Sequence, residues 1–65
     1  MSIDIEKQDD GTFTATIDLD DGTQVTGNGD SELDAAENLF DELEELASDV
    51  ARARRRVQNW IEDNR

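Results

Sequence analysis

Apolar and polar side chains alternate along the first 27 residues of the chain. Ile3 and Ile5 alternate with polar neighbours, residues 13–19 repeat the alternation, and Val25 lies between two polar residues. A period of two is typical of strands with one buried and one exposed face. The pattern therefore predicts three strands in an antiparallel sheet that is covered on one side.

The tetrapeptide Asp-Asp-Gly-Thr follows the first and the second predicted strand, at residues 9–12 and 20–23. A two-residue turn at each Asp-Gly pair would place polar residues opposite apolar ones on the same face, which makes that register unfavourable. A three-residue loop that ends on a left-handed glycine instead places Ile17 opposite both Ile3 and Val25. We therefore predict a β-meander whose two hairpins share one apolar face.

A helical pattern follows the Gly-Asn-Gly segment at residues 27–29, which we expect to end the sheet. Asp30 or Ser31 provides an N-cap, and apolar residues then recur at alternating steps of three and four, interrupted only by Arg54. Neither Pro nor Gly occurs after residue 29. The sequence predicts one long helix over residues 31–62, with a break near Ser48-Asp49 as the alternative.

The length of that helix implies a partner for its second half. Strands of six or seven residues span about 20 Å, whereas 32 helical residues span about 48 Å. We therefore predict a single α+β domain over residues 1–65 (βββα) that forms a homodimer, its long helices antiparallel about a two-fold axis near Val50. A broken helix that folds back on its own sheet would leave a monomer. The predicted dimer interface comprises Phe40, Leu43, Ala47, Val50, Ala53, Val57, Trp60 and Ile61.

The chain is strongly acidic, with 18 Asp and Glu against six Lys and Arg and a net charge of −12. Dense carboxylates with a single lysine resemble the composition of proteins from extreme halophiles. At about 1 M salt the Debye length is only about 3 Å, so self-repulsion is screened, whereas in dilute buffer it opposes the compact state. We therefore expect a haloadapted protein that folds in molar salt, with an acidic mesophilic regulator as the alternative.

The basic residues are concentrated near the C-terminus, in a cluster formed by Arg52, Arg54, Arg55 and Arg56. Such a cluster is a candidate contact for an acidic protein partner or for nucleic acid. The alternative is charge balance, and cations toward the C-terminal end of a long helix would also suit its dipole. The overall negative charge argues against nucleic acid, whose affinity depends on attraction to phosphates.

The composition limits the kinds of catalytic and metal sites that the chain can form. The absence of Cys and His removes thiolate sites and ordinary zinc sites, and Tyr is absent too. The Asp-rich turns fail the spacing of a calcium loop, and the Gly-Asn-Gly segment lacks the lysine of a phosphate loop. We expect no enzymatic activity, cofactor, metal or small-molecule substrate. No apolar run is long enough for a membrane span and no leader opens the chain, so we expect a cytoplasmic protein.

Three segments of the chain form a pattern that a known family shares: the Phe-x-Ala-x-Ile-Asp-Leu strand at residues 13–19, the Gly-x-Gly-Asp-Ser segment at 27–31, and Ala-x-x-Asn-Leu at 35–39. In these segments the chain resembles the HicB-type antitoxin domain. The resemblance implies a three-stranded sheet packed on this helix, and an antitoxin domain that binds a small RNA-cleaving toxin. We predict a non-enzymatic protein-interaction module, a stand-alone HicB-like regulator. A nucleic-acid-associated protein that uses the arginine cluster is the alternative.

Overall fold

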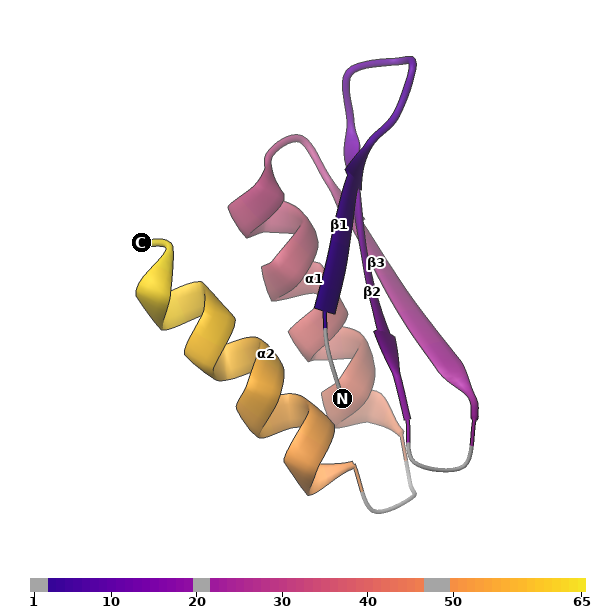
Figure 1. The fold of residues 1–65 in the computed structure, drawn as a ribbon, viewed down its shortest axis with the longest axis vertical. Coiled ribbons are helices and arrows are strands. Elements are labelled where there is room, and N and C mark those ends of the chain that lie inside the picture. Colours follow the sequence, from indigo (N-terminus) through magenta and orange to yellow (C-terminus); the bar gives the residue numbers. More distant parts are fainter. Residues whose placement is uncertain (1–2, 20–21, 47–49) are drawn as a thin grey trace.

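The computed structural model describes residues 3–19, 22–46 and 50–65. Its elements are β1 (Ile3–Lys7), β2 (Phe13–Asp18), β3 (Gln24–Gly29), α1 (Glu32–Glu45) and α2 (Ala51–Asp63). The three strands form one antiparallel sheet in the order β1-β2-β3. Both helices lie on the same side of this sheet and run antiparallel to each other (Figure 1). The predicted α+β class and the antiparallel meander are confirmed.

The hairpin register agrees with the prediction from loop geometry. Ile17 pairs with both Ile3 and Val25. In the first loop the Gln8 amide donates to the Thr12 carbonyl at 2.7 Å. Gly11 and Gly22 have φ angles of 89° and 90°, in the left-handed region that glycine adopts readily. The two glycines therefore allow both hairpins to place their apolar side chains on one face.

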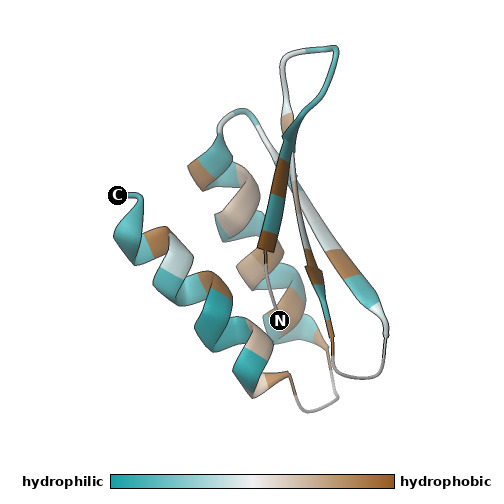
Figure 2. Cartoon of the chain, in the orientation of Figure 1, coloured by the Kyte–Doolittle hydropathy of each residue, from teal (hydrophilic) through white to brown (hydrophobic). Residues whose placement is uncertain are grey.

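The core lies between that face of the sheet and the two helices. Along the strands and helices, hydrophobic and hydrophilic positions alternate (Figure 2). α1 packs mainly on β3 and β2, whereas α2 packs mainly on α1. The buried apolar side chains form one continuous cluster of Ala15, Ile17, Ala35, Ala36, Leu39, Leu43, Val50, Ala53, Val57 and Ile61.

Two glycines of β3 allow the close approach of α1. A Cβ added at Gly27 would lie 2.3 Å from the Leu39 amide nitrogen and 2.8 Å from the Ala35 carbonyl oxygen. A Cβ at Gly29 would lie 2.5 Å from the Ala35 nitrogen. The expectation that residues 27–29 end the sheet is therefore wrong. These residues pair with β2 as part of β3, because glycines in a strand can mark the close approach of another backbone.

α1 begins as predicted, because the Ser31 hydroxyl accepts a hydrogen bond from the Asp34 amide at 3.1 Å. It does not continue to residue 62. Leu46 has an extended backbone (φ −76°, ψ 136°), and α2 begins only after Val50. The prediction of one continuous helix is wrong, and the break falls at the predicted alternative position. Ser48-Asp49, the expected second cap, lies outside the described residues.

The fold-back of α2 satisfies the apolar stripe within one chain. Val57 is fully buried, and Val50, Ala53 and Ile61 are 7%, 1% and 6% exposed. Dimerisation through a single long helix is therefore not supported, because these side chains already occupy the core of their own chain. Of the other predicted interface residues, Leu43 is fully buried, Phe40 and Trp60 are partly buried against the core, and Ala47 lies outside the described residues. The apolar surface that α2 needs comes mainly from α1 of the same chain, not from a second copy.

None of the helices in the described part of the chain is long and apolar enough to cross a membrane.

Candidate interaction surface

The arginine cluster occupies the first two turns of α2. Because α2 begins at Ala51, these cations lie at the N-terminal half of a helix. The interpretation that they complement the dipole of a long helix at its C-terminal end is therefore wrong. At this end the dipole disfavours positive charge, typically by a few tenths of a kcal/mol per exposed group. Val50, the N-cap residue, forms no side-chain capping bond, and the first turn contains no acid.

The antiparallel pairing of α1 and α2 compensates for the unfavourable positive charge at the start of α2. The C-terminal end of α1, where the helix dipole favours cations, carries Glu42, Glu44 and Glu45 and no basic residue in its last turn. The fold-back places this end beside the start of α2 (Figure 1). Each helix end is unfavourably charged by itself, and together they attract each other. The charge asymmetry thus favours the helical hairpin.

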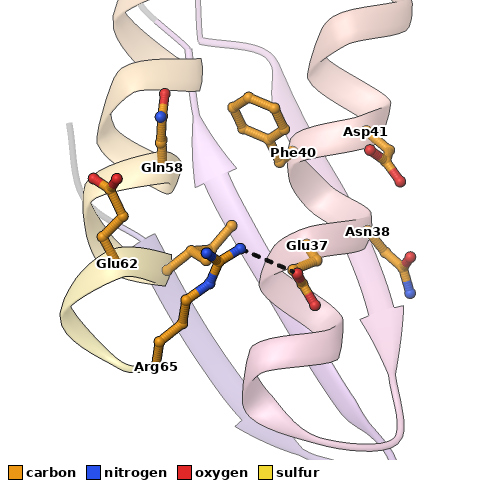
Figure 3. Close-up of a pocket in the computed structure, with 8 residues that line it drawn as sticks. Glu37, Asn38, Phe40, Asp41, Gln58, Glu62 and Arg65 are labelled. Carbon is orange, nitrogen blue, oxygen red and sulfur yellow. Dashed lines mark ion pairs between the residues drawn. The ribbon is translucent and has the colours of Figure 1, made fainter.

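A shallow groove follows the seam between the helices. It consists of two adjoining hollows of about 470 and 360 Å³, which share Phe40 and Gln58. In Figure 3 the Phe40 ring lies between the two helices, with Gln58 on α2. We call this feature the interhelical groove. Its lining comprises Glu37, Asn38, Phe40, Asp41, Ala51, Arg54, Arg55, Gln58, Ile61, Glu62 and Arg65.

The two ends of the interhelical groove differ in charge pairing. At one end an Arg65 guanidinium nitrogen lies 3.8 Å from a Glu37 carboxylate oxygen (Figure 3). Both side chains are largely exposed, at 66% and 46%, so this pair adds little stability. At the other end Arg54 and Arg55 lie across the seam from α1, and neither forms an ion pair with any described residue. Within the described part of the chain, no carboxylate is paired with their guanidinium groups.

The structure divides the predicted cluster. Arg54 and Arg55 line the interhelical groove, whereas Arg52 and Arg56 do not. All four are exposed on α2. The sequence identified the cluster but not this division, because the division depends on where α2 begins and on which of its faces meets α1. The contribution of Phe40 was missed for the same reason, since the long-helix prediction placed it in a dimer core.

The outward face of the sheet carries a network of polar side chains. Gln8 Nε2 donates to the Thr14 hydroxyl at 3.1 Å, and that hydroxyl donates to Asn28 Oδ1 at 2.9 Å. At one end of this row is an open hollow of about 620 Å³ next to Asp30. The side chains of the row are satisfied across the strands. The network therefore stabilises the register and does not by itself form a site.

The Asp10 carboxylate has a shifted pKa, and the cause is its hydrogen bonding. Hydrogen bonds from the Thr12 hydroxyl (2.7 Å) and the Thr12 amide (3.0 Å) hold the pKa of Asp10 below its ordinary value. A lowered pKa means that these bonds stabilise the fold at neutral pH and weaken as the pH falls through it. Asp10 thus closes the first hairpin loop. No charged side chain is buried among the described residues, and they contain no group of potential metal ligands.

Two of the three segments that carry the HicB resemblance, residues 27–31 and 35–39, form the junction of β3 and α1. Gly27 and Gly29 face the α1 backbone, and the Asn38 side-chain amide donates a hydrogen bond to the Asn28 carbonyl. Leu39 is fully buried next to Gly27. These residues therefore have a packing role that is independent of any toxin contact.

Comparison with protein-family models, with curated proteins and with solved structures gave no match.

Proposed function

We propose that the protein is a non-enzymatic protein-interaction module that binds an acidic surface of a protein partner in its interhelical groove. Arg54 and Arg55 carry the proposal, because they are exposed at the N-terminal half of a helix and have no carboxylate partner among the described residues. Phe40, between the helices, offers an aromatic contact beside them. Arginine next to an aromatic side chain is typical of the residues that dominate protein interfaces.

The absence of buried charge in the described segments supports a non-enzymatic role. A general acid at neutral pH needs a carboxyl group in an apolar environment, and no described charged side chain is buried. Within this proposal the protein is a stand-alone HicB-like regulator that is haloadapted and cytoplasmic. Association with nucleic acid is the second candidate, favoured by the exposure of all four arginines of the cluster. The net charge of −12 opposes the approach of any polyanion, and it weakens this candidate more because nucleic acid carries a far denser negative charge than an acidic protein surface.

Two matched double variants test the proposal. Arg54→Ala with Arg55→Ala removes the groove arginines, whereas Arg52→Ala with Arg56→Ala removes the same charge outside the groove. The probes are an amphipathic peptide of Glu and Leu and a single-stranded RNA of similar length. Binding is followed by fluorescence anisotropy and NMR shifts, at the lowest salt concentration that keeps the chain folded. We expect the peptide to shift the Phe40 and Gln58 resonances, and the groove variant alone to weaken binding at least about tenfold.

Two results would overturn the proposal. If the Glu-Leu peptide does not bind the wild-type protein, the interhelical groove is not a site for an acidic partner. If only RNA binds and both double variants weaken it equally, affinity depends on total positive charge, as expected for contacts to phosphates. That outcome favours the nucleic-acid-associated alternative.

A further inference from the structure

Near the start of α2 the surface around the interhelical groove has an acidic and a basic side, whereas at the other end of the groove Glu62 of α2 lies with Arg65. α1 contributes Glu37, Asp41 and Glu44, which share one exposed face because residues three and four apart lie on the same side of a helix. α2 contributes Arg54 and Arg55 on the other side of the seam. The acidic residues of α1 and the two arginines of α2 thus lie on opposite sides of the seam, and Figure 3 shows Phe40 between the two helices.

We infer that this surface is self-complementary and that its partner is a second copy of the chain. This inference rests on the proposed function and names the partner of that same groove. A two-fold contact brings the same patch of both copies together, so the patch must complement itself. We place the two-fold axis in the plane where the two copies meet, parallel to the helices and along the seam between them. α2 of each copy then faces α1 of the other. Arg54 and Arg55 then oppose Asp41 and Glu44 of the second copy.

The charge pattern selects this orientation. A two-fold axis in the same plane but perpendicular to the helices would place α2 on α2 and α1 on α1, so arginines would oppose arginines. α1 contains seven acidic residues and no basic one, so that arrangement opposes like charges along the contact, a cost that salt reduces but does not reverse in sign. The axis along the seam also brings the two Phe40 rings together at the centre of the contact. The result is a four-helix arrangement with a sheet on each outer side.

A second copy also suits the energetics of so short a chain. A domain of 65 residues buries too little surface to be very stable alone, and oligomerisation is one of the ordinary remedies. The groove arginines of one copy lack carboxylate partners among the described residues, and the acidic strip of the other copy supplies them. This contact leaves the buried cluster of each chain intact, unlike a dimer through a continuous helix.

A mixing experiment with two charge-reversed variants tests the inference. The first carries Arg54→Glu and Arg55→Glu, which makes both strips acidic, and the second carries Asp41→Arg and Glu44→Arg, which makes both strips basic. Light scattering and sedimentation are measured at the lowest salt concentration that keeps each chain folded, checked by circular dichroism. We expect a dimer for the wild type, a monomer for each variant alone, and a one-to-one heterodimer after mixing. Reversal on both strips restores opposite charges at both contacts of the heterodimer.

The outcomes separate this inference from the proposed function. A monomeric wild type that still binds the Glu-Leu peptide keeps the interaction module and overturns self-association. A wild-type dimer that both variants leave intact places the dimer contact elsewhere and overturns the inference. Variants that are monomeric alone and stay monomeric after mixing overturn it as well, because charge complementarity then plays no part. Reversal at Arg52 and Arg56, outside the groove, is the matched control and should leave the dimer unchanged.

Discussion

Replacing Gly27 with alanine is expected to unfold most of the protein. The added Cβ would meet the Leu39 nitrogen at 2.3 Å and the Leu39 Cα at 2.6 Å, and both are backbone atoms of α1 that cannot rotate away. α1 would have to move off the sheet and open the core around Leu39. Overpacking typically costs about 1–3 kcal/mol, and we expect the upper end of this range because the clashing atoms belong to the backbone. A core of this size rarely supplies more than about 3–5 kcal/mol in total.

Two control substitutions isolate the cause of that loss. Thr26→Ala changes the neighbouring residue on the exposed face of β3 and should cost well under about 1 kcal/mol. Gly11→Ala introduces a Cβ into open space but at a φ of +89°, so it should cost about 1 kcal/mol or somewhat more through backbone strain alone. Urea unfolding in molar salt measures the free energy of unfolding of all three variants. A Gly27→Ala protein as stable as Thr26→Ala would contradict the close packing of β3 on α1.

Lowering the salt concentration is expected to unfold the wild-type protein. The net charge is −12 on 65 residues, and the Debye length grows from about 3 Å in 1 M salt to tens of ångströms in dilute buffer. Salt also screens the attraction between α1 and α2, but the overall repulsion involves many more charges. We expect full helicity by circular dichroism at about 2 M NaCl and loss of the melting transition at about 20 mM.

A charge-reduced variant provides the control for that titration. Asp4→Asn, Glu6→Gln, Asp9→Asn and Asp63→Asn neutralise four exposed acids that lie outside the interhelical groove and away from the C-terminal end of α1. The salt concentration at the folding midpoint should fall clearly in this variant. An identical midpoint, or a wild type that stays folded with an unchanged melting temperature at about 20 mM salt, would show that self-repulsion is not what salt relieves.

The sheet was predictable because local rules determine it. Only one loop length keeps the apolar faces of the hairpins together, and the φ angles of Gly11 and Gly22 agree with it. The glycines of β3 were misinterpreted because their reason lies in α1, which is remote in sequence. The same limit applies to the helices. No Pro or Gly marks the break, and the continuous apolar stripe fits a second chain as well as a fold-back.

The candidate surface was predictable only in part. The arginine cluster is visible in the sequence, but its position at the N-terminal half of a helix follows only from the start of α2 at Ala51. Arg54 interrupts the apolar stripe, and in the structure it lies at the edge of the interhelical groove. Charge reversal across the break was the available signal for a hairpin. It was equally compatible with two antiparallel chains, so the sequence could not decide.

The fold-back of α2 on α1 is the central claim, because the interhelical groove exists only if one chain contributes both helices. The chain has no cysteine, so Glu37→Cys and Glu62→Cys introduce two unique sites for spin labels. Both residues line the groove, and packed helices have axes about 8–10 Å apart, so we predict a label separation below about 20 Å. Double electron–electron resonance in molar salt measures the distance between the two labels. The labelled protein is diluted in unlabelled protein so that only distances within one chain contribute. One continuous helix would separate these residues by about 38 Å, and that distance would contradict the fold described above.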